Sequence, residues 1–194
     1  MTHLKSLAIA ATAALLLASP VRADDRYEIF NFGKLFGGSG NMSTAGSSSF
    51  GRHTVSIDPR YAPGTIVIRT SERRLYYVTA RGQAIQYGIG VGRQGFQWSG
   101  VKTVSAKKEW PSWTPPSQML RRRPDLPRYM PGGIDNPLGA RAMYLGSSLY
   151  RIHGSNEPET IGQAVSSGCF RMTNEDVVDL YNRVRVGATV YVLR

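Results

Sequence analysis

The sequence predicts a mainly β fold with a few short helices, and two observations lead to that class. Short runs rich in β-branched and aromatic residues are separated by polar or glycine turns, a spacing typical of a largely antiparallel sheet structure. Only one segment, near the C-terminus, has the pattern of an amphipathic helix. The predicted strands span residues 65–70, 74–79, 83–89, 101–107, 143–152 and 189–193.

The predicted helix begins after Thr173, whose hydroxyl can cap the first turn, with Asp176 three residues further on as its capping-box partner. We expect the helix to end before Gly187. Its apolar residues fall roughly on one face, which we expect to pack on the sheet: Val177, Val178, Tyr181 and Val184.

Residues 1–23 are expected to form a secretory signal peptide. Lys5 provides the positive start, an apolar run follows over residues 7–18, and a small-residue cleavage site ends at Ala23. The alternative, an ordinary buried first helix, fits less well because the run is too uniformly apolar for one-sided packing. The run is also shorter than the roughly 20 residues that span a membrane, so we expect a periplasmic protein without a transmembrane span after cleavage.

Residues 24–63 are expected to form a flexible N-terminal segment, and residues 64–194 the folded domain. Within that segment, residues 31–51 hold six glycines and five serines in 21 positions, a composition typical of a linker. A second unusual stretch lies inside the domain, because six of the 11 prolines fall between Trp110 and Pro131. Such a loop is usually a lid over a site or an extended surface arm, and we expect a semi-rigid lid.

Charge and cysteine content restrict the classes of function. The chain carries 24 Lys and Arg against 13 Asp and Glu, a net charge of +11. Apart from the triple at 121–123 the basic residues are scattered, and export would remove the protein from nucleic acid, so no nucleic-acid partner is expected. The single cysteine, Cys169, excludes an intrachain disulfide and a multi-cysteine metal site, and we expect neither a metal nor a cofactor.

Cys169 is the candidate nucleophile. A lone cysteine in an exported protein can be a core residue, an unpaired thiol or a nucleophile, and the neighbours favour the last. Ser166, Ser167 and Gly168 precede it and leave the backbone open around the sulfur. Arg171 can favour the thiolate if its side chain points toward the sulfur.

A thiolate nucleophile needs a general base, and three histidines are present. His3 lies in the segment expected to be removed, and His53 lies at the edge of the linker, where a solvated side chain is expected. His153 ends an apolar strand and precedes Gly154, a position where a catalytic side chain is both held and exposed. A structural histidine is the alternative reading of this position.

These residues carry a resemblance to a known family. Ile-His-Gly around His153, the fifteen residues between His153 and Cys169, and the run Ser-Ser-Gly-Cys-Phe-Arg-Met followed by Thr-Asn-Glu-Asp resemble the signature of the L,D-transpeptidases, the family with the YkuD-type catalytic domain. Residues 131–140 are similar to the family's approach to the histidine strand, and the resemblance covers about residues 65–194. Many members have histidine where this chain has Ser167, which leaves His153 as the candidate base.

The resemblance implies an L,D-transpeptidase-type β-sandwich catalytic domain over residues 64–194, with one helix after the catalytic cysteine. It also implies a peptidoglycan acyltransferase without a cofactor. Cys169 would attack the carbonyl of the third residue of a tetrapeptide stem, a meso-diaminopimelate, and release D-alanine from a thioester, while His153 moves the proton.

The residues around this pair are expected to support the reaction. A backbone carbonyl, most simply that of Gly154, is expected to fix the tautomer of His153, and the amides of Gly168 and Cys169 are the expected oxyanion donors. Arg171 is expected either to bind a donor carboxylate or to hold the loop. The expected oxyanion and support residues are Gly154, Ser166, Ser167 and Gly168.

The residues leave the acceptor open. An amine of a second diaminopimelate would give a 3-3 cross-link, an amine of an outer-membrane protein or lipoprotein would anchor that protein to the wall, and water would make the enzyme an L,D-carboxypeptidase. Transfer is favoured because the resemblance implies a family that acts mainly as transferases in cell-wall biogenesis and cell shape. The resemblance also implies that carbapenems acylate Cys169. A non-catalytic wall-binding module is the rival class, which the intact cysteine and histidine positions oppose.

Overall fold

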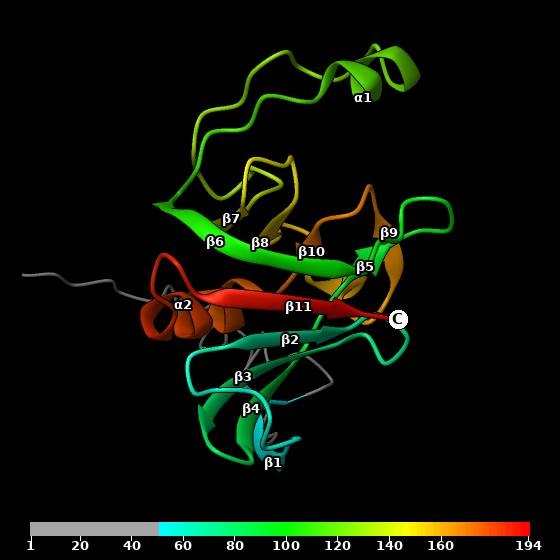
Figure 1. The fold of residues 1–194 in the computed structure, drawn as a ribbon. Coiled ribbons are helices and arrows are strands. Elements are labelled where there is room, and N and C mark those ends of the chain that lie inside the picture. Colours follow the sequence, from blue (N-terminus) through cyan, green and yellow to red (C-terminus); the bar gives the residue numbers. More distant parts are fainter. Residues whose placement is uncertain (1–50) are drawn as a thin grey trace, which may run out of the picture. The chain divides into compact units, whose positions relative to one another are not determined.

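The structure is a computed structural model, and it describes residues 51–194 (Figure 1). The expected signal peptide and linker residues up to 50 lie outside the described residues. The strands are β1 (His53–Ser56), β2 (Ile66–Arg69), β3 (Arg74–Ala80), β4 (Gln83–Gly88), β5 (Val91–Gly92), β6 (Gly100–Glu109), β7 (Arg141–Leu145), β8 (Arg151–His153), β9 (Ala164–Ser166), β10 (Phe170–Arg171) and β11 (Thr189–Leu193). The helices are α1 (Ser117–Arg122), α2 (Asn174–Arg183) and a 3-10 turn over Pro158–Thr160.

The strands form a folded sheet in the order β1-β4-β3-β2-β11-β6-β7-β8-β10, and β5 pairs with β9 separately. β6 links the two layers, because its first half pairs with β11 and its second half with β7, and the β6–β7 register shifts between Val104 and Ala106. Figure 1 shows β6 and β11 side by side between the β2-β3-β4 layer and the β7-β8-β10 layer. Pairing is antiparallel except between β2 and β11, β8 and β10, and β5 and β9, so the largely antiparallel prediction is confirmed.

Apolar side chains from both layers meet in one large core, and a smaller cluster of Val67, Tyr76, Val78 and Ala84 is separate from it. Fully burying each large aliphatic or aromatic side chain contributes about 1.5–3 kcal/mol, so this core is the main source of stability. Its fully buried members include residues of β2, β3, β4, β7, β8 and α2: Ile66, Leu75, Tyr87, Met143, Ile152 and Leu180. Two layers around a shared core form the sandwich that the resemblance implied.

The predicted helix is confirmed as α2. Thr173 is its N-cap, and the threonine hydroxyl accepts a hydrogen bond from the Asp176 amide at 3.1 Å. Of the four residues expected on its apolar face, Val177 and Val184 are buried and Val178 and Tyr181 are half-buried. Leu180, which the predicted face did not include, is also fully buried. The helix ends at Arg183, before Gly187, as expected.

Two expected boundaries differ from the structure. The predicted strand over residues 143–152 is wrong: β7 ends at Leu145, and the chain turns through Gly146, whose φ of +60° lies in the left-handed region, before β8 begins. The sheet also starts before residue 64, because β1 pairs with β4 and lies inside the expected flexible segment. His53 begins β1 and is exposed, with its Nε2 3.2 Å from the side-chain nitrogen of Gln86.

The proline-rich stretch is an arm that leaves the sheet after β6 and returns to it at β7 (Figure 1). Trp113 and Met130 hold its two sides together through a pair of backbone hydrogen bonds of 2.8 Å. The arm contains α1, a helix that the sequence analysis did not predict because prolines flank it at 115, 116 and 124.

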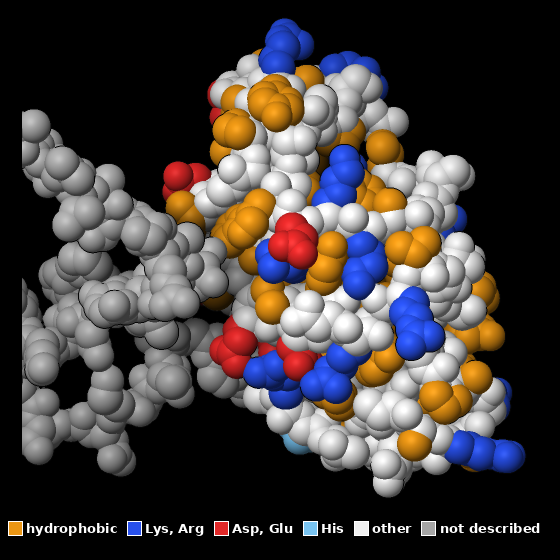
Figure 2. Space-filling model, turned by 90° about the vertical axis from the view of Figure 1, so that its left-hand side faces the viewer, with side chains coloured by type: hydrophobic (Ala, Val, Ile, Leu, Met, Phe, Trp, Pro, Cys, Tyr) orange, Lys and Arg blue, Asp and Glu red, His pale blue; other side chains and the backbone are white. Residues whose placement is uncertain are grey.

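The charged side chains on the face drawn in Figure 2 are distributed among neutral ones and form no continuous basic surface. Acidic side chains lie beside several of the basic ones on this face. No helix within residues 51–194 is long and apolar enough to cross a membrane.

Candidate active site

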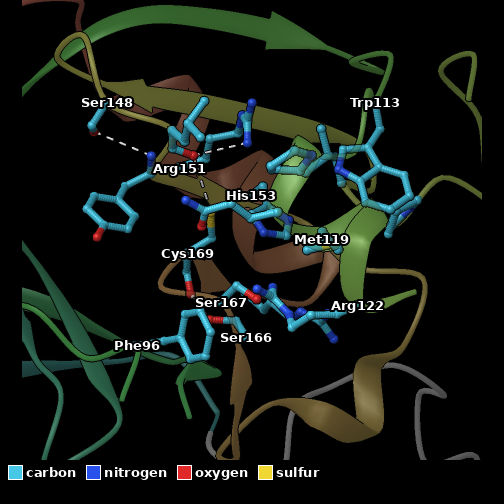
Figure 3. Close-up of a pocket in the computed structure, with 17 residues that line it drawn as sticks. Phe96, Trp113, Met119, Arg122, Ser148, Arg151, His153, Ser166, Ser167 and Cys169 are labelled. Carbon is cyan, nitrogen blue, oxygen red and sulfur yellow. Dashed lines mark hydrogen bonds between the residues drawn. The ribbon is translucent and has the colours of Figure 1, made fainter. Parts of the chain in front are cut away.

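Cys169 lies in the short loop between β9 and β10, at the wall of a cavity (Figure 3). β9 of the two-stranded sheet ends at Ser166, and β10 at the edge of the large sheet begins at Phe170, so each end of the loop is held by a different sheet. The cavity has a volume of about 410 Å³, and His153 lines it together with Cys169. The fold therefore brings the two candidate catalytic residues to one site.

Hydrogen bonds and an aromatic pair fix the conformation of this loop. Ser166 Oγ donates to the Cys169 carbonyl at 2.6 Å and accepts from the Gly168 amide at 3.1 Å. Gly168 has a φ of +109°, and a Cβ there would lie 2.6 Å from the Tyr150 ring, so only glycine fits. Trp98 stacks on Tyr150 with ring centroids 4.5 Å apart, and its Nε1 donates to the Gly168 carbonyl at 2.8 Å. The backbone beside the sulfur is thus held from both sides.

His153 is the last residue of β8, and only 4% of its surface is exposed. Its Nδ1 lies 2.6 Å from the Gly154 carbonyl oxygen, which can only accept, so Nδ1 carries the proton and Nε2 is the basic nitrogen. Burial lowers the pKa of His153 to about 3; the bond to Gly154 opposes this shift, whereas the charges of Arg171 and Arg151 add to it. The ring is therefore neutral at neutral pH, which is the state that a general base needs.

The Cys169 thiol donates a hydrogen bond to the Leu149 carbonyl oxygen at 3.6 Å. Burial raises the pKa of this thiol, while the charge and hydrogen bonding of Arg151, followed by the charge of Arg171, act to lower it. Burial prevails, so the resting state is a neutral thiol near a neutral imidazole. The sulfur must lose its proton during the reaction rather than before it.

Arg151 is a candidate site residue that the sequence analysis missed. It precedes His153 by two positions on β8, and alternate residues of a strand point to the same face, which is the signal that could have found it. Its Nη1 donates to the Leu149 carbonyl oxygen at 3.1 Å, the same oxygen that accepts from the thiol (Figure 3). Its Nε is buried and has no hydrogen-bond partner within the described chain.

The remaining predicted residues also lie at or beside the cavity. Ser167 and Arg171 line it, and the Arg171 guanidinium forms an ion pair of 2.7 Å with Glu157. Gly154 is buried, and a side chain at its position would collide with Asn174. Within residues 51–194, no three His, Cys, Asp or Glu side chains are grouped in a way that could hold a metal ion.

The proline-rich arm forms one wall of the cavity. Trp113, Met119 and Arg122 line the cavity from the arm, and Phe96 lines it from the loop between β5 and β6 (Figure 3). The cavity therefore lies between this arm and the sheet, and a ligand at Cys169 would contact both.

Comparison with known proteins identifies the family. A model of the family described as the L,D-transpeptidase catalytic domain, YkuD, matches residues 63–192. The chain belongs to this family, and the resemblance seen in its motifs is confirmed.

Individual relatives agree with this assignment. The probable L,D-transpeptidase ErfK/SrfK of Escherichia coli is 39% identical over 137 residues, which cover 66% of this chain and 43% of the relative. The match thus spans less than half the length of that curated relative.

Solved structures share the fold. A crystal structure from Brucella melitensis, described as a probable carnitine operon oxidoreductase caia, is 48% identical and covers 72% of this chain and 91% of its own, with a TM-score of 0.51. L,D-transpeptidase 3 of Mycobacterium tuberculosis, solved with a faropenem-derived adduct, is 19% identical and covers 67% of this chain and 60% of its own, with a TM-score of 0.55. These likenesses confirm the predicted fold class.

Proposed function

We propose that this protein is a peptidoglycan L,D-transpeptidase in which Cys169 is the nucleophile and His153 the general base. The observation that carries the proposal is that a thiol and a neutral imidazole of fixed tautomer line one cavity in a chain of this family. The donor is a tetrapeptide stem, and the first product is a thioester with the third residue of that stem.

In the acylation step, Nε2 of His153 accepts the proton of the Cys169 thiol while the sulfur attacks the carbonyl carbon of the third residue. The bond between that carbon and the nitrogen of D-alanine then breaks. The imidazolium returns the proton to the leaving amine, so free D-alanine departs and the thioester remains. The Gly154 carbonyl keeps Nδ1 protonated throughout, which reserves Nε2 for this transfer.

The oxyanion that forms during attack requires hydrogen-bond donors close to the sulfur. The Gly168 amide already donates to Ser166 Oγ, so an oxyanion would have to share that donor. We therefore assign the main oxyanion contact to the Cys169 amide. Ser166 supports the loop through its two hydrogen bonds, and Arg171 supports it through the ion pair with Glu157.

The second half-reaction transfers the acyl group to an amine. A diaminopimelate amine gives a 3-3 cross-link, whereas a lysine amine of an outer-membrane protein or lipoprotein anchors that protein to the wall. Water in place of the amine would make the protein an L,D-carboxypeptidase. The proposal favours transfer, because the E. coli relative is described as a probable L,D-transpeptidase.

The Brucella protein is described as a probable oxidoreductase, which suggests a different function, and one motif of this chain has a spacing typical of that class. Residues 90–95 have the G-x-G-x-x-G spacing of dinucleotide-binding loops. In those loops the motif follows a strand and opens a helix, whose N-terminus meets the pyrophosphate. Here the motif contains the short strand β5, and the next element is β6, another strand. The motif lacks its structural context, so acyl transfer is better supported.

The first test replaces the two reacting side chains. Cys169→Ala is expected to abolish D-alanine release and cross-link formation, because the thioester cannot form, and His153→Ala is expected to reduce both almost as far. A double variant no slower than the slower single variant would show that the two residues act as one unit. Mass spectrometry of the enzyme with isolated muropeptides measures donor, acceptor and product together. Substantial turnover by Cys169→Ala would overturn the thioester mechanism.

We also propose that the protein works in the periplasm after removal of residues 1–23. Support comes from the charged start, the apolar run and the small-residue site at Ala23, all of which lie outside the described residues. The mature chain is expected to begin at Asp24. N-terminal sequencing of protein from a periplasmic extract tests this, and retention of Met1 in a membrane fraction would contradict it.

A further inference from the structure

A second cavity of about 410 Å³ lies next to the one that contains Cys169. The two cavities share part of their walls, including Trp113, Met119 and Ser167. A ligand that extends from the reacting sulfur can therefore continue into the second cavity. The proposed function assigns no role to this space.

Four arginines line the second cavity, and two of them are already paired with acidic side chains. Arg123 forms an ion pair of 2.6 Å with Asp125, and Arg171 forms one of 2.7 Å with Glu157. These two guanidinium groups are occupied by the protein itself, so they contribute little free positive charge to the cavity.

The other two arginines, Arg93 and Arg122, are not paired in this way. Within residues 51–194 neither guanidinium makes an ion pair with a carboxylate, and the contact that each has is with the ring of Phe96. The Arg93 guanidinium lies 4.4 Å from the ring centroid and that of Arg122 lies 5.3 Å from it. Arg93 follows β5, whereas Arg122 ends α1 on the arm, so the ring joins two separate segments.

Two guanidinium groups on one ring repel each other unless an anion lies between or beside them. Among residues 51–194, two acidic residues line this cavity: Glu157 is already bound to Arg171, and Asp135 remains as the one opposing carboxylate. The cavity therefore has an excess of positive charge beside the reacting centre. Guanidinium groups bind carboxylates with two parallel hydrogen bonds, which makes a carboxylate the best matched anion.

We propose that Arg93 and Arg122 form a subsite for the side-chain carboxylate of diaminopimelate in a stem peptide. This inference rests on the proposed function, which brings stem peptides to Cys169, and it adds the recognition of a specific charged group. Both the donor and the acceptor stem carry this carboxylate, and the experiment separates the two sources. Because one arginine belongs to the arm and the other to the body of the domain, the bound carboxylate also holds the arm against the cavity.

The test compares peptides with and without the carboxylate. The rate of Cys169 acylation is measured by intact-mass spectrometry with a tetrapeptide donor whose diaminopimelate carboxylate is free or amidated. In a second experiment, product formation is measured with an unmodified donor and an acceptor whose diaminopimelate carboxylate is free or amidated. Each ratio of rates is determined for the wild type, Arg93→Gln, Arg122→Gln and the double variant. Arg121→Gln is the matched control, because it removes one positive charge from the neighbouring position of α1, outside both cavities.

The wild type is expected to prefer the free carboxylate by roughly tenfold in either the donor or the acceptor experiment, since a charge-assisted hydrogen bond has about that effect. The double variant is expected to lose this preference, and Arg121→Gln to retain it. If the double variant loses the preference in the donor experiment, the subsite binds the donor stem. If it loses the preference in the acceptor experiment, the subsite binds the acceptor stem. Three results would overturn the subsite. The double variant could keep the preference, the wild type could show no preference in either the donor or the acceptor experiment, or Arg121→Gln could lose the preference equally. A wild type that never acylates would instead overturn the proposed function, and the subsite with it.

Discussion

At the scale of single residues, backbone carbonyls contact both of the proposed reacting groups. The Gly154 carbonyl holds the proton of His153 on Nδ1, and the Leu149 carbonyl accepts from both the Cys169 thiol and Arg151. When the thiol loses its proton, the sulfur becomes an acceptor and can no longer bond to a carbonyl. The Nε of Arg151, which is buried and has no hydrogen-bond partner within residues 51–194, is a donor that the thiolate can use instead.

The first prediction concerns Arg151 and the ionisation of Cys169. Arg151→Met removes the positive charge that lowers the pKa of the Cys169 thiol most. The thiol should therefore titrate at higher pH, and its alkylation by iodoacetamide near neutral pH should slow by roughly tenfold. The control is Arg141→Met on the neighbouring strand β7. Arg141 also has a buried Nε without a partner in the described part of the chain, but it does not line the cavity. The pH profile of alkylation is the measurement. Equal profiles for the two variants would restrict Arg151 to a structural role.

The second prediction concerns His153 and acid stability. Burial lowers the folded-state pKa of His153 to about 3, well below the ordinary value of about 6.5. The unfolded chain therefore binds one more proton between those values, and the folded state loses stability as the pH falls from 6.5 toward 3. His153→Gln should reduce the slope of unfolding free energy against pH in this window by about one proton, or ~1.4 kcal/mol per pH unit. Urea unfolding at several pH values tests it, and an unchanged slope would contradict it.

At the scale of the secondary-structure elements, sequence patterns predicted correctly those helix and strand ends that depend on residues close together in the chain. The capped start of α2 at Thr173 and the end of a strand at His153 are of this kind, and both were predicted correctly. The hairpin between β7 and β8 was missed because the break at residues 146–148, Gly-Ser-Ser, is short and has apolar residues on both sides. Helix α1 was missed because its flanking prolines favour an irregular loop.

The contacts of the site depend on pairing between distant strands, which no local pattern contains. The parallel pairing of β8 with β10 places His153 opposite Arg171 and beside the loop of Cys169. The contacts of Arg151 depend on the same pairing, and strand alternation from His153 indicated only which face its side chain is on. The motif resemblance supplied the His153 and Cys169 pair, whereas the contact of Trp98 with the Gly168 carbonyl required the structure.

The third prediction concerns the arm. Trp113 lines both cavities, so Trp113→Ala should slow acylation by the peptide donor by about tenfold and leave alkylation by a small thiol reagent unchanged, if the arm closes over the peptide. Tyr129→Ala is the control, because Tyr129 is an exposed aromatic residue of the same arm that lines neither cavity. A lower melting temperature with unchanged donor kinetics would show that the arm acts in stability instead.

At the scale of the whole molecule, the site exists only in the folded chain. Its wall combines the loop after β5, the proline-rich arm, β8 and the loop between β9 and β10, which are far apart in the sequence. A thiol reagent needs only the sulfur, whereas an acylating substrate needs the sulfur, the base and the oxyanion donor together. A reagent of the second kind therefore reports on the assembled site.

The last prediction uses such a reagent. Imipenem should add one covalent mass to the folded enzyme at Cys169, because its strained carbonyl can take the place of the scissile amide, with the oxygen on the Cys169 amide, and a serine-directed penicillin should react poorly. The rate should rise with pH through the titration of the thiol, whose pKa burial raises, and show no further loss near pH 6, because His153 stays neutral there. Intact-mass spectrometry over time measures both. His153→Ala should react much more slowly, and protein unfolded in urea should not react. An unmodified Cys169 in folded, donor-active enzyme after long incubation would show that the cavity does not bind acylating substrates in the way proposed.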